Sequence, residues 1–175
     1  MRHLLLFLLV FAAGTLSAQL IINDEFTAKG GSAEGALNFE QGEIMPNLRF
    51  KNLKAQTFNL HDKLDKLTII EFWYTTCKTC VNNKQYISKF ANQYNINVVS
   101  IAIDEKPSTV RKYLADNNIH WDNVQDSSAF NGFYQKTKGV ATPTYLIVNT
   151  DKEIVQVLSG ASNIGKIGVF LQNHF

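Results

Sequence analysis

A run of β-branched and aromatic residues at 67–74 is the feature that most constrains how this chain folds. Such a nearly continuous apolar run is typical of a strand that is covered on both faces within a sheet surrounded by helices. Cys77 and Cys80 follow directly, and from Ile87 the apolar positions repeat with the three-to-four-residue spacing of a helix. The chain is therefore expected to change from strand to helix at the two cysteines.

The rest of the chain predicts further strands and helices on either side of this point. Leu48 and Phe50 alternate with polar neighbours, and Phe58 and Leu60 repeat the pattern, which indicates a β-hairpin. Further strands are expected at 96–103, 119–124, 144–148 and 153–158, and further helices at 108–117, 129–136 and 164–174. This order predicts an α/β fold in which a central mixed sheet is flanked by helices and preceded by an N-terminal hairpin.

The first residues have the pattern of a secretory signal peptide. Arg2 precedes an apolar run at 4–14, and small residues lead to an expected cleavage site after Ala18. The run is shorter than the ~20 apolar residues that span a bilayer, so membrane association is expected only if this segment stays uncleaved. The sequence thus predicts a signal peptide at 1–18, a lead-in segment at 19–45, one domain at 46–175, and an extracytoplasmic, most simply periplasmic, location.

Composition and charge narrow the classes of function. A hydrophobic content of 45% in 175 residues excludes a disordered chain and favours one domain with a sizeable core. The formal charge of only +2, without a long basic cluster, argues against nucleic acid or an anionic membrane surface as a partner. A monomer is expected. Because disulfides persist outside the cytosol and the chain has two cysteines, any internal bridge must join Cys77 to Cys80.

The two cysteines are placed for thiol chemistry. A helix that begins at a cysteine points free N–H groups and the positive end of its dipole at the sulfur, which favours the thiolate. The thiolate is the nucleophile of disulfide exchange, so Cys77 is expected to attack a substrate sulfur. Cys80, three residues later on the same helical face, is expected to resolve the mixed disulfide. Lys78 adds a positive charge that further favours the Cys77 thiolate.

The motif W-Y-T-T-C-K-T-C after an apolar strand, followed much later by G-V-A-T-P-T, resembles the thioredoxin superfamily. The resemblance covers Pro46 to Phe175 and is strongest to the TlpA/ResA-like extracytoplasmic thioredoxins. It implies a thioredoxin-like fold and a thiol–disulfide oxidoreductase that acts on protein thiols and disulfides. It also implies an unidentified redox partner protein, and neither a cofactor nor a metal.

The resemblance further assigns residues to the site. Thr142–Pro143 is expected to be a cis peptide facing the cysteines, which leaves the Thr142 backbone free to pair with an extended substrate. Glu71 matches the buried acid of thioredoxins, and a carboxyl group enclosed by apolar neighbours suits a proton acceptor for Cys80. Trp73 is expected to share the strand face of Glu71 and to shield the substrate-binding side of the site.

Several alternatives stay open from the sequence. Glu71 could be a strand-end acid that reaches water or pairs with a lysine. The two cysteines could form a structural disulfide, or hold copper together with a distant histidine in a metal carrier. The fold could also serve as a non-enzymatic binding module. Thr79 and Asn83 stand where many extracytoplasmic relatives carry proline and an acid, which argues against a partner in cytochrome c maturation.

Overall fold

The computed structural model describes residues 39–103, 106–124 and 141–175. The expected signal peptide, most of the lead-in segment and the helix expected at 129–136 lie outside the described residues. Within the described part, no helix is both long enough and apolar enough to cross a bilayer.

A mixed five-stranded sheet forms the centre of the structure. Its strands are β3 (Thr68–Trp73), β4 (Asn97–Ala102), β5 (Asp122–Val124), β6 (Thr144–Val148) and β7 (Ile154–Ser159), in the spatial order β5-β4-β3-β6-β7. β3 is parallel to β4 and antiparallel to β6, and every residue of β3 is buried. The predicted central strand is therefore confirmed, with a neighbour on each edge and cover on both faces.

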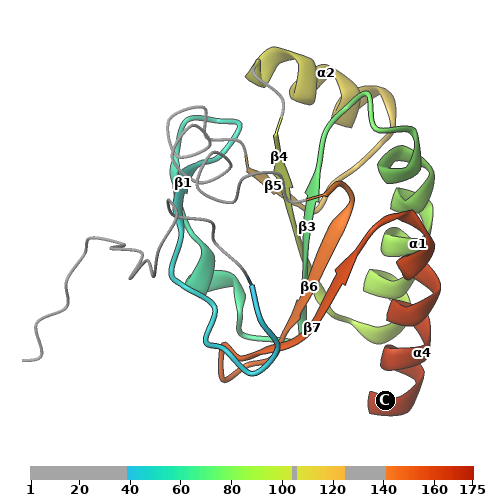
Figure 1. Cartoon of the computed structure of the whole chain (residues 1–175). Coiled ribbons are helices and arrows are strands. Elements are labelled where there is room, and N and C mark those ends of the chain that lie inside the picture. The colour runs from blue at the N-terminus through green and yellow to red at the C-terminus, as the bar shows by residue number, and fades with distance from the viewer. Residues whose placement is uncertain (1–38, 104–105, 125–140) are drawn as a thin grey trace, which may run out of the picture.

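Helices cover one face of this sheet. They are α1 (Lys78–Tyr94) and α4 (Ile164–His174), which lie side by side along it, while α2 (Pro107–Asp116) lies near the end of the sheet where β3 leads into α1 (Figure 1). Ile87 of α1 and Ile167 of α4 pack with Ile69 of β3 in one buried cluster. α1 and α4 approach closely at Gly168, where an added Cβ would lie 3.2 Å from the Phe90 ring.

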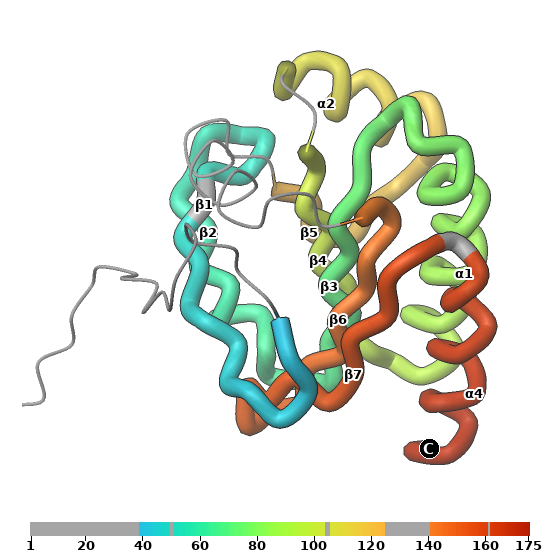
Figure 2. The backbone as a smooth tube through the Cα atoms, viewed as in Figure 1, coloured from blue at the N-terminus to red at the C-terminus, as the bar shows by residue number. Residues whose placement is uncertain are grey.

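The N-terminal part of the described chain covers the opposite face (Figure 2). It contains the antiparallel pair β1 (Arg49–Lys51) and β2 (Thr57–Asn59), followed by a 3-10 turn at Leu60–Lys63. Before β1, residues 42–45 run beside the start of β7, where the Met45 N–H donates to the Lys152 carbonyl at 2.7 Å. A second 3-10 turn at Ala161–Asn163 connects β7 to α4.

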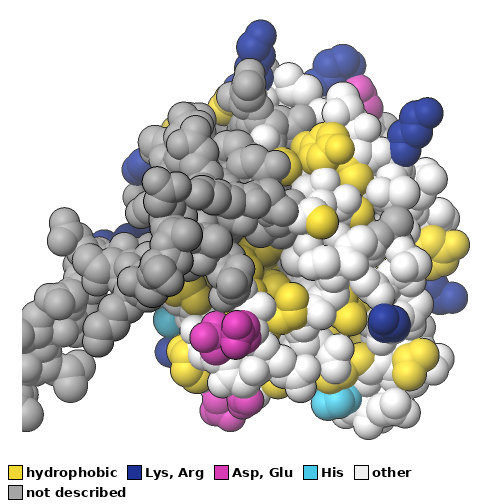
Figure 3. All heavy atoms as spheres, viewed as in Figure 1, with side chains coloured by type: hydrophobic (Ala, Val, Ile, Leu, Met, Phe, Trp, Pro, Cys, Tyr) yellow, Lys and Arg dark blue, Asp and Glu magenta, His cyan; other side chains and the backbone are white. Residues whose placement is uncertain are grey.

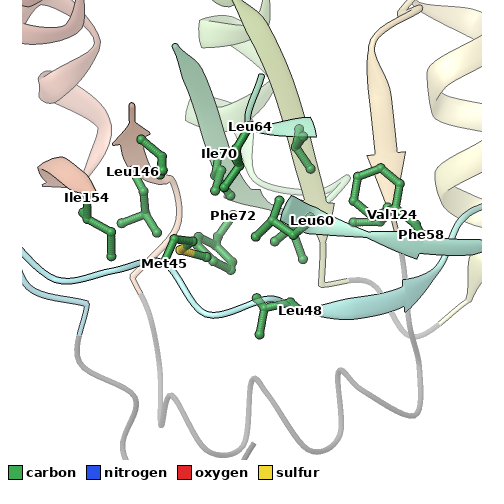
Figure 4. Close-up of a cluster of buried hydrophobic side chains, with 13 residues drawn as sticks. Met45, Leu48, Phe58, Leu60, Leu64, Ile70, Phe72, Val124, Leu146 and Ile154 are labelled. Carbon is green, nitrogen blue, oxygen red and sulfur yellow. The ribbon is translucent and has the colours of Figure 1, made fainter. Parts of the chain in front are cut away.

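This segment completes the larger hydrophobic core, which Figure 4 shows in close-up. In Figure 4, Met45 and Leu60 lie close to Phe72 of β3, and Leu48 and Leu146 belong to the same buried cluster. Since Met45 is fully buried, the core begins on the N-terminal side of the domain boundary expected at residue 46.

Most predicted elements occur within a few residues of their expected bounds. The strand predicted at 119–124 is shorter and begins at Asp122, because Asn118 has a positive φ of 54° and the Ile119 N–H bonds back to the Leu114 carbonyl of α2. The start of that segment therefore closes α2 instead of extending β5.

On the face seen in Figure 3, the described basic and acidic side chains lie scattered among apolar and polar ones.

The buried position of Met45 gives a test of how firmly the N-terminal segment is attached. Met45→Ala is expected to lower the free energy of unfolding by about 2–5 kcal/mol, because it leaves a cavity under the segment. Ile44→Ala is the matched control, since Ile44 is 62% exposed, and should change it by less than about 0.5 kcal/mol. Urea denaturation measures both, and an equally small effect of the two variants would show that the segment contributes little.

Candidate redox site

The alternation of β3 divides its side chains between two environments. Ile70 and Phe72 pack against the N-terminal segment, whereas Ile69 packs against α1 and α4. By the two-residue period of a strand, Glu71 and Trp73 share the face of Ile69. The expected common face of Glu71 and Trp73 is therefore confirmed, and it is the face that α1 covers.

Cys77 and Cys80 form a disulfide at the N-terminus of α1. Cys77 is the N-cap residue, and its sulfur accepts the Cys80 backbone N–H at 3.1 Å. The Thr79 hydroxyl lies 3.5 Å from the same sulfur. Lys78, the first residue of α1, is exposed. The predicted strand-to-helix change at the cysteines is confirmed, and the Cys80 backbone N–H points towards the Cys77 sulfur.

The disulfide is enclosed by a disulfide cluster, which we define as the buried residues Trp73, Cys77, Cys80, Ala102, Val110 and Leu114. Cys80 has no exposed surface and Cys77 is 5% exposed. Trp73 is also fully buried, and its ring centroid lies 5.2 Å from that of Tyr113 on α2. Trp73 therefore borders the site from the interior of the protein.

Glu71 is fully buried but does not lie among apolar neighbours only. Its Oε2 accepts a hydrogen bond from the Lys84 ammonium of α1 at 2.7 Å and another from the Ser100 hydroxyl of β4 at 2.7 Å. Trp121 in turn donates its indole N–H to the Ser100 oxygen at 2.8 Å. The expectation of an apolar surrounding is thus wrong, and pairing with a lysine, the alternative left open by the sequence, is what the structure has.

Lys84 is held on more than one side. Its side chain is 4% exposed, and its Nζ lies 3.6 Å from the centre of the Trp73 ring, within range of a cation–π interaction. Burial lowers the pKa of Lys84, while the charge and the hydrogen bond of Glu71 act against that decrease. The ammonium of Lys84 therefore depends on the Glu71 carboxylate for compensation.

A second polar pair lies on the same face of the sheet. Asn83 of α1 donates to the Tyr145 phenol oxygen of β6 at 3.0 Å. Burial, followed by the negative charge of Glu71, raises the pKa of Tyr145 well above its usual range. The same two causes, in the same order, raise the pKa of Tyr113.

Thr142 and Pro143 precede β6 at the same end of the sheet as the cysteines. Their peptide bond is cis, which confirms that expectation. Because Thr144 pairs with Phe72 in the antiparallel β3–β6 register, Pro143 lies beside the end of β3, just before the chain reaches Cys77. Pro143 is buried and Thr142 is half-buried.

Sequence reasoning missed the polar residues that surround Glu71. The sequence pattern does not single out Lys84 or Ser100, and Asn83 is noted only as standing where many extracytoplasmic relatives carry an acid. The available signal for Lys84 was its spacing of four residues from Cys80, which places both on one face of the helix. In the described part of the chain, no group of three or more His, Cys, Asp or Glu side chains is arranged to hold a metal ion.

Comparison with known protein families shows which family this chain belongs to. The family model described as Redoxin matches residues 40–167, which is most of the chain and includes the disulfide, Glu71 and Thr142–Pro143. The chain belongs to the redoxin family. The thiol-disulfide oxidoreductase ResA of Bacillus cereus is 22% identical over 151 residues, a stretch that covers 84% of this chain and 86% of that protein.

Solved structures of redoxin-like proteins share the fold. The thioredoxin domain of a thiol-disulfide oxidoreductase from Bacteroides vulgatus superposes with a TM-score of 0.66 at 19% identity, covering 77% of this chain and 99% of that chain. A thiol:disulfide interchange protein from Bacteroides sp. gives 0.64 at 19% identity, with coverage of 76% and 91%. The fold is thioredoxin-like, and the chain is a thioredoxin-like thiol-disulfide oxidoreductase of the TlpA/ResA type.

The Asn83–Tyr145 pair yields a test of the polar face. Tyr145→Phe is expected to lower the free energy of unfolding at neutral pH by about 0.5–1.5 kcal/mol, because the buried hydrogen bond from Asn83 is lost. Above pH ~10 the difference from wild type should narrow. The phenol of Tyr145 ionises more readily in the unfolded state than in the folded state, where its pKa is raised, so the wild type loses folding stability as the pH rises. The variant has no phenol at this position and does not lose this stability.

Urea denaturation from pH 7 to 11 measures this difference. Tyr86→Phe is the matched control, because Tyr86 is 47% exposed on α1 and should show little change at any of these pH values. A Tyr145→Phe variant with wild-type stability at pH 7 would contradict the expected role of the pair.

Proposed function

We propose that the mature protein is exported and exchanges its Cys77–Cys80 dithiol and disulfide with protein substrates. The observation that carries this proposal is the cysteine pair at the start of α1, where the Cys77 sulfur caps the helix and Cys80 lies buried behind it. In the reducing direction, the Cys77 thiolate attacks a substrate disulfide, one substrate sulfur leaves as a thiol, and a mixed disulfide forms.

The second cysteine completes the exchange. The Cys80 thiolate attacks the Cys77 sulfur, so the Cys77–Cys80 bond forms and the bond to the substrate breaks. The released substrate sulfur takes up a proton, and two electrons have passed from the enzyme to the substrate. Glu71 accepts the proton of Cys80 as that thiol becomes the nucleophile. An unidentified redox partner restores the starting state.

Other parts of the site support binding and reactivity. The Thr142 backbone pairs with an extended substrate segment beside Pro143, and Trp73 shields the interior side of the disulfide. Lys78, exposed beside Cys77, stabilises the thiolate. The export proposal is supported by the signal pattern at 1–18 and by the relatives of the ResA type. The protein acts as a monomer and does not use a nucleic-acid partner or a cofactor.

Single cysteine variants test this order of attack. Cys77→Ser should reduce the rate of insulin disulfide reduction on the order of a thousandfold, because the attacking sulfur is lost. Cys80→Ser should retain the first attack and accumulate a covalent mixed disulfide, visible as a mass shift that dithiothreitol removes. Both cysteines of the chain are at this site, so no other thiol can contribute.

Two outcomes would contradict the proposal. Wild-type exchange by either variant would contradict thiol chemistry at this site. If the reduced wild type instead retained stoichiometric Cu(I) or Zn²⁺ after dialysis and showed no exchange, a metal carrier would replace the oxidoreductase. The measured reduction potential assigns the direction, since about −270 mV is typical of a reductant and about −120 mV of an oxidant.

A further inference from the structure

Lys84 and Cys80 lie four residues apart on α1 and face the same buried region. Residues with this spacing are neighbours on one side of a helix, with Cβ atoms about 5–6 Å apart. The Lys84 side chain is 4% exposed and Cys80 has no exposed surface. A buried ammonium group one helical turn from the resolving sulfur is an unusual charge to keep, because an isolated buried lysine loses its proton readily.

The contacts of Lys84 fix where this charge lies. Its Nζ is 2.7 Å from Glu71 Oε2, 3.6 Å from the centre of the Trp73 ring and 5.5 Å from the centre of the Trp121 ring. Trp73 belongs to the disulfide cluster together with Cys80. The ammonium is therefore held between the acid on β3 and the aromatic wall of the redox site.

The two oxygen atoms of Glu71 have different surroundings. Oε2 accepts hydrogen bonds from Lys84 and Ser100. Oε1 is buried and, among the described residues, has no hydrogen-bond partner. A buried carboxylate oxygen without a donor is rare in folded proteins and often marks a functional group. Oε1 is thus the position on Glu71 that is open to a proton.

We propose that Lys84 is a positioning residue for the resolving step, in which its ammonium is a counter-ion shared by the Glu71 carboxylate and the Cys80 thiolate. This inference rests on the proposed function and adds a residue to it. Before the step the buried region holds Lys84 ammonium, Glu71 carboxylate and Cys80 thiol. After proton transfer it holds Lys84 ammonium, Glu71 carboxylic acid and Cys80 thiolate.

The step is balanced in atoms and in charge. The Cys80 thiol gives its proton to Glu71 Oε1, and the thiolate then attacks the Cys77 sulfur of the mixed disulfide. The new Cys77–Cys80 bond replaces the bond to the substrate, and the substrate sulfur leaves with the electron pair. One cation and one anion are present before and after the proton moves, so the transfer creates no uncompensated buried charge.

Removal of the Lys84 ammonium would destabilise both the Glu71 carboxylate and the Cys80 thiolate. Without Lys84, the buried Glu71 carboxylate would lose the cation that compensates its charge, and breaking a buried ion pair is strongly destabilising. The Cys80 thiolate would also lose its neighbouring positive charge. The first attack by Cys77 is supported by the Cys80 backbone N–H at the start of α1 and should be spared.

The other ionisable groups on this face do not compete for the proton. Tyr145 of β6 and Tyr113 of α2 lie within the electrostatic reach of Glu71, and burial together with that charge raises both pKa values. Both phenols therefore stay neutral between pH 5 and 9. Ser100 and Trp121, from the β4–β5 side, have no ionisable group in this range. Changes of rate in this window report on Glu71, Lys84 and the two cysteines.

Reaction of the reduced full chain with 5,5′-dithiobis(2-nitrobenzoate) separates the two steps. The first nitrothiobenzoate is released when Cys77 attacks, at a rate proportional to reagent, and the second when Cys80 resolves, at a rate independent of it. For Lys84→Met, the first release should stay within about twofold of wild type. The second should slow on the order of a hundredfold, and its pH midpoint should move to higher pH by about one unit or more.

Matched variants separate this role from a structural one. Lys89→Met removes an exposed lysine from the same helix and should leave both releases unchanged. Lys84→Arg keeps the charge and should restore most of the second rate. Glu71→Gln combined with Lys84→Met removes both charges of the buried pair, so it should fold stably even where Lys84→Met does not, and it should resolve as slowly as either single variant.

The outcomes distinguish the two levels of the proposal. If the wild type reacts in two phases but Lys84→Met resolves at the wild-type rate with an unchanged pH profile, the shared counter-ion is overturned while the oxidoreductase function stands. The same conclusion follows if the double variant recovers both stability and the second rate. If the wild type exchanges no disulfide with any probe, the proposed function itself fails.

Discussion

The two-sided burial of β3 is the constraint on which the rest of the structure depends. β3 is hydrogen-bonded to β4 on one edge and to β6 on the other, and none of its residues reaches solvent. Its alternating side chains therefore require two separate covers, the N-terminal segment on one face and the helices α1 and α4 on the other. The redox site arises where the helical cover begins, at the end of the same strand.

A charge on such a strand restricts how the helix can be placed. Glu71 has no access to water, so its cation must come from an element packed on that face, and α1 supplies Lys84. Breaking a buried ion pair costs about 3–5 kcal/mol, a large share of the roughly 5–15 kcal/mol that stabilises a typical domain. The ion pair thus fixes the rotation of α1 about its own axis, one turn after Cys80.

The sequence predicts the strands and helices, which depend on local residue patterns. It does not predict the contacts that depend on how a helix is rotated and how strands pack against each other. The apolar runs are long enough to locate β3, β4 and β6, and the helical stripe locates α1, because each pattern matches one period. Cys77 and Cys80 are identified by their spacing, and Glu71 by the resemblance to the thioredoxin superfamily. Lys84 is not, because a lysine on an amphipathic helix is usually solvated. Ser100 and Trp121 join the site only through contacts between strands distant in the chain.

The two cysteines sit only three residues apart, yet different kinds of group surround them. The Cys77 sulfur receives a backbone N–H at the start of α1, a donor whose charge does not vary with pH. Cys80 lies one turn deeper, on the helix face that carries Lys84 towards Glu71. Substitutions at residues 78 and 79 would therefore act mainly on the first attack, and substitutions on the buried face of β3 and α1 on the second. The fold thus allows the reactivity of Cys77 towards a substrate sulfur and the rate at which Cys80 releases that substrate to change independently.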